Sequence, residues 1–310
     1  MQTTSHLLMI RPAHFGYNVE TAGNNAFQQV PKGGQAEAVA ISEAAKREFD
    51  GLANELAKAG VQLHVVEDTP EPIKPDAVFP NNWVSFHQDG KVFTWPMFSP
   101  LRRAERREEI IHELARQFEV KERIHLEYFE QKNLFLEGTG SLILDREHKI
   151  AYACRSVRTD EQVLDEFCRI QNYEKCLFDA VDAGGIPVYH TNVMMALGNR
   201  LAVVCLEAIR EERQRRNLLQ MLEGSGKELL NISLEQMGRF AGNMLEVKNT
   251  RDEPFWVMSQ SAWDSLQSTQ RKLLESSGQI LYSDLHIIEI YGGGSARCML
   301  AELFCPSRSV

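Results

Sequence analysis

Residues 192–206, NVMMALGNRLAVVCL, contain an apolar segment, a Gly-Asn turn and a second apolar segment, the pattern of a β-hairpin. The hairpin begins at a polar residue that directly precedes two apolar ones. The same arrangement, a small or polar residue before an apolar pair, occurs five times in the chain, at Asn82, Ser141, Asn192, Asn243 and Cys298. We call these five residues the anchors. Their spacings of 59, 51, 51 and 55 residues (82 to 141, 141 to 192, 192 to 243, 243 to 298) indicate an internal repeat.

Each of the first four hairpins is followed by a segment with apolar residues at helical spacing and then by another strand-like segment. The predicted helices cover 101–118, 160–172, 206–222 and 260–277. The predicted strands after them lie within 123–129, 175–180, 227–232 and 279–285. The repeated unit is therefore ββαβ.

The fifth unit is split between the two ends of the chain. Its first strand follows Cys298, and the missing strand, helix and strand are available at 6–12, 37–60 and 61–68. Pairing of the first and last strands would close a ring of five units and protect the sheet edges. We predict one α/β domain over 1–310, a pseudosymmetric five-unit propeller. The alternative, a doubly wound sheet, expects single helices between strands rather than hairpins.

Composition limits the partners of the protein. The chain has 310 residues, is 43% hydrophobic and carries a net charge of −9, with basic residues scattered among acidic ones. No nucleic acid or anionic membrane is expected to bind such a surface, so a small molecule is the expected partner. The N-terminal sequence lacks the features of a signal peptide or membrane span, which predicts a cytoplasmic protein. The six cysteines show neither zinc-site spacing nor a disulfide framework, and no metal is expected.

A long segment without periodicity, residues 13–35, connects the first strand to the first helix. Long loops in compact domains often cover a functional site, and Phe15, Tyr17 and Phe27 offer apolar anchoring points. We predict that this segment is a lid.

Equivalent ends of the repeats should meet at the axis of the ring, which brings together Glu137, His190 and Cys298. A carboxylate, an imidazole and a thiol are what nucleophilic catalysis with an oriented general base requires. Taken singly, Cys298 could be a small buried side chain and His190 a core histidine. Glu137, however, lies in an apolar, strand-like stretch where an unpaired acid would be costly, and the Gly-rich segment and Arg297 before Cys298 favour reactivity.

Further candidates could bind substrate. Arg158, in RSVRTD, and Arg102, beside Arg103 and Glu105, could hold a carboxylate through paired donors, although the second group also fits a solvated helix surface. Residues 76–86, DAVFPNNWVSF, place Asp76, Asn81 and Asn82 near the axis, where Pro80 and the asparagines also suit a turn.

These motifs resemble the pentein, or guanidino-group-modifying, superfamily: five ββαβ units, a Glu in LEGTG, a His in HTN and a Cys in GGGSARCM. The superfamily includes arginine deiminases, dimethylarginine dimethylaminohydrolases and amidinotransferases. The resemblance implies that Cys298 attacks the substrate carbon, that His190 is the acid and base, and that Glu137 orients His190. It also implies a carboxylate clamp at Arg158, a second arginine at Arg102, and no cofactor.

The chain departs from the dimethylarginine hydrolases after Asp76, where their acidic pair is replaced by Asn81 and Asn82. Amides complement the C=O and NH₂ of a neutral ureido group better than a guanidinium. Together with FPNNW and RCM, which are similar to citrulline utilisation hydrolases, this predicts hydrolysis of L-citrulline to ornithine, CO₂ and ammonia through a covalent intermediate on Cys298. The alternatives are a deiminase or amidinotransferase acting on a guanidine, and a non-catalytic binding member of the superfamily. A homodimer is also possible.

Overall fold

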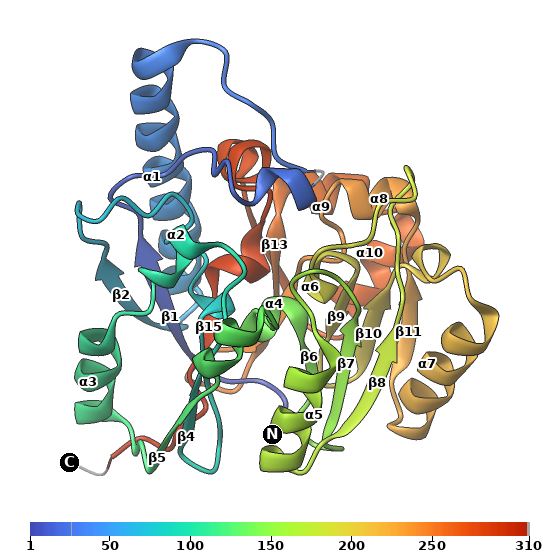
Figure 1. Ribbon diagram of the computed structural model, residues 1–310. Helices are drawn as coiled ribbons and strands as arrows, with labels where there is room; N and C mark the ends of the chain where they lie inside the picture. The colour runs from blue at the N-terminus through green and yellow to red at the C-terminus, as the bar shows by residue number, and fades with distance from the viewer. Residues whose placement is uncertain (26, 309–310) are drawn as a thin grey trace.

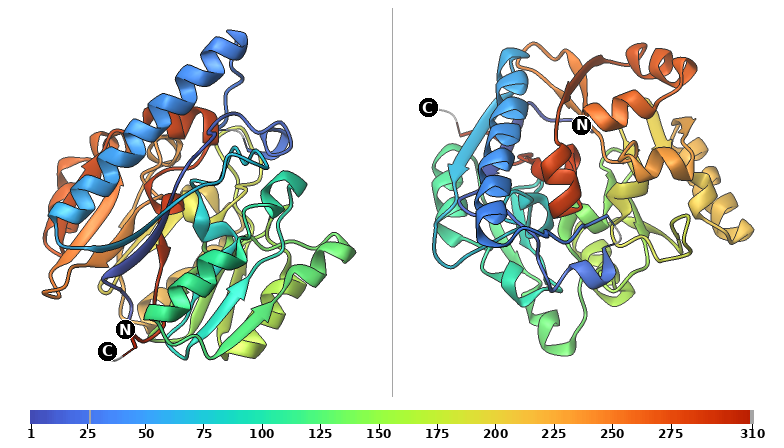
Figure 2. Two further views of the ribbon diagram at one scale, coloured as in Figure 1. Left: turned by 90° about the vertical axis from the view of Figure 1, so that its left-hand side faces the viewer. Right: turned by 90° about the horizontal axis from the view of Figure 1, so that it is seen from above.

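Each of the five repeats forms a three-stranded sheet in the computed structural model, which describes residues 1–25 and 27–308. The middle strand of every sheet pairs antiparallel with one neighbour and parallel with the other. In spatial order the sheets are β15 (Ala301–Glu302), β1 (His6–Arg11) and β2 (Gln62–Glu67); β3 (Val84–Phe86), β4 (Lys91–Thr94) and β5 (Glu122–His125); β6 (Ile143–Asp145), β7 (Ile150–Cys154) and β8 (Glu174–Phe178); β9 (Met195–Leu197), β10 (Leu201–Val204) and β11 (Glu228–Asn231); and β12 (Leu245–Lys248), β13 (Pro254–Ser259) and β14 (Gln279–Ser283). Seen from above, the units surround a common axis (Figure 2).

The ring closes as predicted, because the last strand of the chain pairs with the first. Leu7 and Leu8 of β1 face Glu302 and Ala301 of β15, antiparallel, while β2 pairs with β1 in parallel. The predicted five-unit α/β propeller is therefore confirmed. In Figure 1 the two termini lie at the same end of the molecule, below the sheets.

Helices connect the parallel strands of each unit and cover the outside of the ring (Figure 1). They are α1 (Gly34–Lys58), α2 (Pro100–Arg103) with α3 (Glu108–Gln117), α5 (Glu161–Gln171), α7 (Glu212–Gly224), and α9 (Gln260–Ser265) with α10 (Ser268–Glu275). Their apolar faces are buried; Phe167 of α5, for example, packs against Phe93 and Trp95 of the preceding unit, with ring centroids 5.3 and 5.4 Å away. Burying a side chain of this size stabilises the fold by about 2–3 kcal/mol.

Three of the predicted helices are shorter or interrupted. The segment 101–118 breaks between α2 and α3, and 260–277 breaks where Gln267 caps α10 through a reciprocal bond with Gln270. The segment 206–222 starts as a 3₁₀ turn, η4 (Leu206–Ala208), and α7 begins only after Glu211, whose carboxylate accepts N–H bonds from Arg213 and Gln214. Local side-chain caps thus override the continuous apolar spacing.

The anchors lie in short turns that precede the first strand of each sheet. Four of these turns are helical: η2 (Pro80–Asn82), α4 (Gly138–Ser141), α6 (Thr191–Met194) and η6 (Ala296–Met299). The fourth repeat has a turn closed by the Asn243 N–H on the Phe240 carbonyl at 2.8 Å. All five anchors are buried, as the axis of a packed ring requires.

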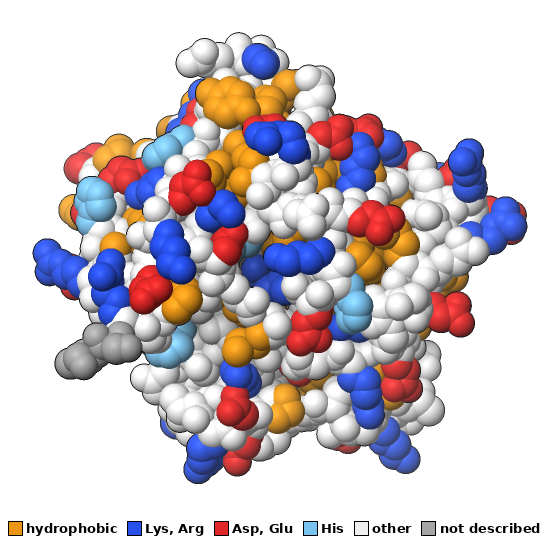
Figure 3. All heavy atoms as spheres, turned by 90° about the horizontal axis from the view of Figure 1, so that it is seen from below, with side chains coloured by type: hydrophobic (Ala, Val, Ile, Leu, Met, Phe, Trp, Pro, Cys, Tyr) orange, Lys and Arg blue, Asp and Glu red, His pale blue; other side chains and the backbone are white. Residues whose placement is uncertain are grey.

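The remaining turns are η1 (Ala22–Asn24), η3 (Glu127–Lys132), α8 (Leu234–Gly238) and η5 (Ile288–Gly292). Among the residues that the structure describes, no helix has the length and apolar character needed to cross a membrane. From below, acidic and basic side chains are interspersed over the face, with Lys and Arg side chains near its centre (Figure 3). The axis at this end is lined by Arg146, Arg297 and Glu302, among others.

Candidate active site

Glu137 and His190 form a buried pair at the axis. The imidazole Nε2 of His190 lies 2.8 Å from Oε2 of Glu137, and the other carboxylate oxygen accepts the N–H of Phe98 at 3.0 Å. Because a carboxylate only accepts, Nε2 carries the proton and Nδ1 is left with a free lone pair. His190 can therefore act as a base through Nδ1.

Glu137 does not lie within a strand, as its apolar surroundings had predicted; it directly precedes α4. Two glycines make this turn possible. Gly138 has φ of 47°, and a Cβ there would lie 2.3 Å from the Asn81 carbonyl oxygen. A Cβ on Gly140 would lie 2.3 Å from Nδ2 of Asn82 and 2.9 Å from Nδ1 of His190. The LEGTG motif therefore keeps the space beside these two nitrogens open.

The charges around the pair set its protonation. Burial lowers the pKa of His190 to about 4, although the bond to Glu137 opposes this shift, so the imidazole is neutral near pH 7. Burial alone would raise the pKa of Glu137, but Arg158 and the bond from His190 hold it well below its usual range. The resting pair is thus a carboxylate and a neutral imidazole.

The neutral state of His190 predicts an acid-sensitive stability. Its folded pKa of about 4 lies below the ordinary 6.5, so only the unfolded chain takes up this proton between those values, and stability falls as the pH drops through that window. From about pH 7 to pH 5 this costs about 2 kcal/mol. His190→Gln should lose that much less stability than the wild type in denaturant titrations at the two pH values. Parallel losses in the two proteins would contradict the prediction.

Cys298 lies in η6 with 3% of its surface exposed. Two side-chain amides donate to its sulfur: Nδ2 of Asn192 and Nδ2 of Asn243, each 3.3 Å from Sγ. The repeat had placed both asparagines at the axis, but sequence reasoning gave neither a role. Arg297, expected to activate Cys298, instead turns away, donating to the Leu300 carbonyl at 2.8 Å and to Glu302 at 2.9 Å.

Cys298 and His190 line one small cavity of about 10 Å³, room for about one water molecule. Thr21 and Asn25, from the segment predicted to be a lid, also line it. The Nδ2 of Asn25 donates to the Gly293 carbonyl at 3.3 Å. The segment therefore covers the site here, and an amino-acid substrate can enter only if it moves; its role as a lid stays a prediction.

Arg158 and Asp76 lie in the wall of this cavity and both contact the covering segment. The Nε of Arg158 donates to Oδ1 of Asn24 at 2.8 Å, and NH1 is 3.6 Å from Glu137. Asp76 accepts from Nδ2 of Asn18 at 2.7 Å. The donors of Arg158 are thus partly occupied by the segment that would have to move, and its role as a carboxylate clamp remains a prediction.

Arg102 is fully engaged by protein groups and is not on a solvated surface. Its guanidinium makes two 2.9 Å bonds to Glu105, and lies 3.6 Å from both Asp76 and Glu137. NH1 also donates to Oδ1 of Asn82 at 2.9 Å. Arg102 therefore orients Asn82 and balances the acids, rather than offering a free fork to a substrate.

The two asparagines of FPNNW differ in position. Asn82 lines the cavity, whereas Asn81 is buried outside it. Within the described residues, Nδ2 of Asn82 has no hydrogen-bond partner, and neither do the side-chain atoms of Asn81. Asn82 is thus the one of the pair whose amide can meet a substrate directly.

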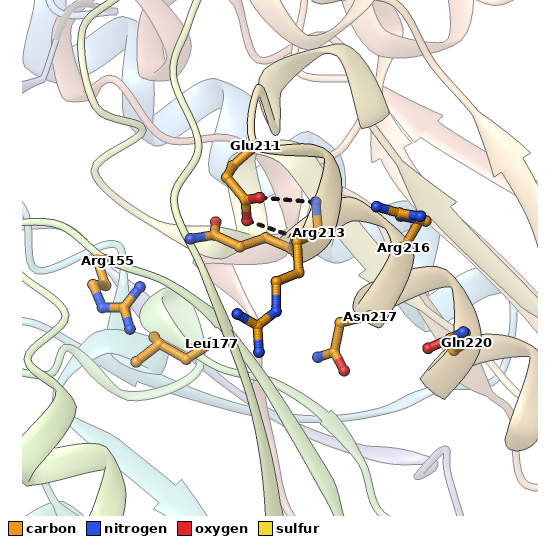
Figure 4. A pocket seen from close by; sticks show the side chains of 8 residues that line it. Arg155, Leu177, Glu211, Arg213, Arg216, Asn217 and Gln220 are labelled. Carbon is orange, nitrogen blue, oxygen red and sulfur yellow. Dashed lines mark hydrogen bonds between the residues drawn. The ribbon is translucent and has the colours of Figure 1, made fainter.

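The largest hollow of the surface, about 680 Å³, lies elsewhere, between β8 and α7 (Figure 4). Arg155, Arg213 and Arg216 contribute to it, but it holds no member of the Glu137, His190 and Cys298 group. Size alone is therefore misleading, and the small covered cavity is the candidate site. Among residues 1–25 and 27–308, no three His, Cys, Asp or Glu side chains gather as a metal site would require.

Residues 11–305 match the family profile described as N,N dimethylarginine dimethylhydrolase, eukaryotic. The chain belongs to this family. Its membership confirms the resemblance to guanidino-group-modifying enzymes and places the protein among enzymes that cleave C–N bonds of such groups. A search of curated protein sequences returns no match.

Solved structures similar to this dimethylarginine dimethylhydrolase family member share its fold at low identity. ArgZ, an arginine dihydrolase from the ornithine-ammonia cycle in Cyanobacteria, is 17% identical with a TM-score of 0.72, covering 97% of this chain and 41% of that one. A mutant of AgrE in complex with L-arginine is 18% identical with a TM-score of 0.72, covering 98% and 41%. A dimethylarginine dimethylaminohydrolase adduct with S-methyl-L-thiocitrulline is 12% identical with a TM-score of 0.64, covering 97% and 100%. The chain thus spans less than half of the ArgZ and AgrE chains.

Proposed function

We propose that the protein hydrolyses the ureido group of L-citrulline, giving ornithine, CO₂ and ammonia. The observation that carries this proposal is the orientation of Asn82. Arg102 can only donate, so its 2.9 Å bond fixes Oδ1 of Asn82 and leaves Nδ2 as the group that faces the cavity. An unpartnered buried N–H donor complements the carbonyl oxygen of a ureido group, which a guanidinium lacks.

The charges support the same substrate class. In the place where acids would bind a substrate guanidinium, the guanidinium of Arg102 already lies 3.6 Å from Asp76 and from Glu137. A second cation beside Arg102 and Arg158 would meet like charges in a buried site. A neutral ureido group avoids that cost.

The reaction would proceed in two balanced steps. The thiolate of Cys298 attacks the ureido carbon, and collapse of the adduct breaks the bond to the ornithine nitrogen, which takes a proton from His190; a carbamoyl thioester remains. Nδ1 of His190 then takes a proton from water, the hydroxide displaces the thiolate, and the released carbamate decomposes to CO₂ and ammonia. Glu137 holds the ring and compensates its charge while it is protonated. The N-terminal domain of ArgZ has been captured covalently bound to a reaction intermediate, which supports a covalent route.

A second candidate, hydrolysis of arginine, is favoured by the relatives, since ArgZ is an arginine dihydrolase and AgrE binds L-arginine. A deiminase or amidinotransferase acting on a guanidine uses the same three residues. The choice depends on whether Asn82 meets a carbonyl oxygen or a cation.

A substrate panel with one variant separates these candidates. The wild type should release ornithine and ammonia from citrulline faster than from arginine, methylated arginine or agmatine. Asn82→Asp removes the free N–H donor and should lower kcat/KM for citrulline by about 10²-fold, as loss of a donor to a reacting carbonyl does. The assay is ornithine and ammonia release by the purified protein.

Asn81→Asp is the matched control, because it makes the same chemical change at a neighbouring buried residue outside the cavity wall. Provided that thermal unfolding shows it folded, it should keep most of its citrulline turnover. Faster turnover of arginine than of citrulline by the wild type would overturn the proposed substrate.

A further inference from the structure

The sulfur of Cys298 is the meeting point of three repeats. Asn192 comes from the third unit, Asn243 from the fourth and Cys298 from the fifth, and each amide Nδ2 is 3.3 Å from Sγ. All three residues occupy the anchor position of their unit, so the symmetry of the fold itself brings two amides to the nucleophile. All three are buried, which strengthens such contacts relative to water.

The orientation of the Asn243 amide is fixed by its other contacts. Its Oδ1 accepts the backbone N–H of Arg297 at 3.1 Å, and its Nδ2 donates to the carbonyl of Asn192 at 2.8 Å. Exchanging the oxygen and nitrogen would place donor against donor and acceptor against acceptor. The group that faces the sulfur is therefore an N–H donor.

Other sources of positive charge for a thiolate are turned away or neutral. The guanidinium of Arg297 is directed to the Leu300 carbonyl and Glu302. His190 directs Nε2–H to Glu137 and is neutral near pH 7, since burial lowers its pKa to about 4. The two amides are the donors within reach of Sγ in the described part of the chain.

We propose that Asn192 and Asn243 are catalytic residues that stabilise the thiolate of Cys298 by donating two N–H bonds to it. The inference rests on the proposed function only in taking Cys298 as the nucleophile. Bonds to a charged acceptor are stronger than bonds to a neutral one, so the amides favour the thiolate over the thiol. The nucleophile is thereby activated before substrate binds and without an imidazolium.

Two variants test this inference. Asn192→Leu keeps the size of the side chain and removes one donor; since the Asn192 amide has no other hydrogen bond among the described residues, little else is lost. Asn243→Asp keeps the acceptor for the Arg297 N–H but replaces the second donor with a negative charge. In each variant the ultraviolet absorbance of the Cys298 thiolate is followed through a pH titration, with the same protein carrying Cys298→Ala as the blank.

The midpoint of thiolate formation should rise by on the order of one pH unit in Asn192→Leu and by more in Asn243→Asp. For Asn192→Leu, kcat should fall while KM changes little, because the lost bond acts on the nucleophile. Unchanged midpoints in folded variants of both kinds would overturn the inference. As no substrate is present in the titration, the result stands or falls separately from citrulline turnover.

Asn217→Leu is the matched control. Asn217 lies on α7, where its Nδ2 is 3.7 Å from the sulfur of Cys176, outside the active site. The substitution makes the same change near another cysteine and should leave both the Cys298 midpoint and kcat unchanged. A shift of the Cys298 midpoint in this variant equal to that in Asn192→Leu would show a non-specific effect and contradict the inference.

Discussion

Cys298→Ala is expected to abolish citrulline turnover, with a loss of at least about 10⁴-fold, because no other group at the axis can form the covalent intermediate. The side chain is small and buried, so alanine should fit with little loss of stability. Turnover is measured as ornithine release. Acid quenching of the wild type during turnover, followed by mass spectrometry, should show one carbamoyl group on the peptide that contains Cys298.

Cys305→Ala is the control for this result. Cys305 is also buried, and burial raises the pKa of its thiol to about 11, so it stays protonated and unreactive near neutral pH. This variant should retain full activity. Appreciable turnover by a pure Cys298→Ala protein, or a carbamoyl group on another cysteine, would contradict the assigned role of Cys298.

The repeat made the fold predictable from sequence because it concerns spacing, which survives large changes in side chains. Five anchors at nearly equal intervals required five equivalent units, and the split fifth unit required the first and last strands to pair. The helix interruptions were not predictable in the same way. They depend on single side-chain caps, such as Glu211 and Gln267, which the apolar spacing does not encode.

The candidate site followed the same division. Glu137, His190 and Cys298 could be brought together from their positions in the repeat, and the structure places Glu137 against His190 and Cys298 in the same cavity. The partners of Arg158 in the covering segment could not, because that segment has no periodicity that would place Asn24 beside it. The bond from Arg102 to Asn82 was equally hidden, since it joins residues twenty positions apart through one side-chain rotamer.

Glu137→Gln is expected to lower kcat by about 10³- to 10⁴-fold. The amide of glutamine can donate to Nε2 of His190, which favours the tautomer with its proton on Nδ1 and removes the base from the cavity side. The change also deprives Arg102 and Arg158 of a carboxylate 3.6 Å from each guanidinium. Loss of one partner from a buried ionic group costs about 3–5 kcal/mol, so the variant should also unfold more easily.

Glu105→Gln separates the two effects, because Glu105 bonds to Arg102 through two 2.9 Å contacts and makes no hydrogen bond to His190. Both variants should lose stability in denaturant titrations, since each removes a buried partner of Arg102. Only Glu137→Gln should combine that loss with a fall in kcat of at least about 10³-fold, measured where both variants are folded. Equal falls in kcat would mean that Glu137 acts through the Arg102 network, and a Glu137→Gln enzyme within tenfold of the wild type would contradict its role in orienting His190.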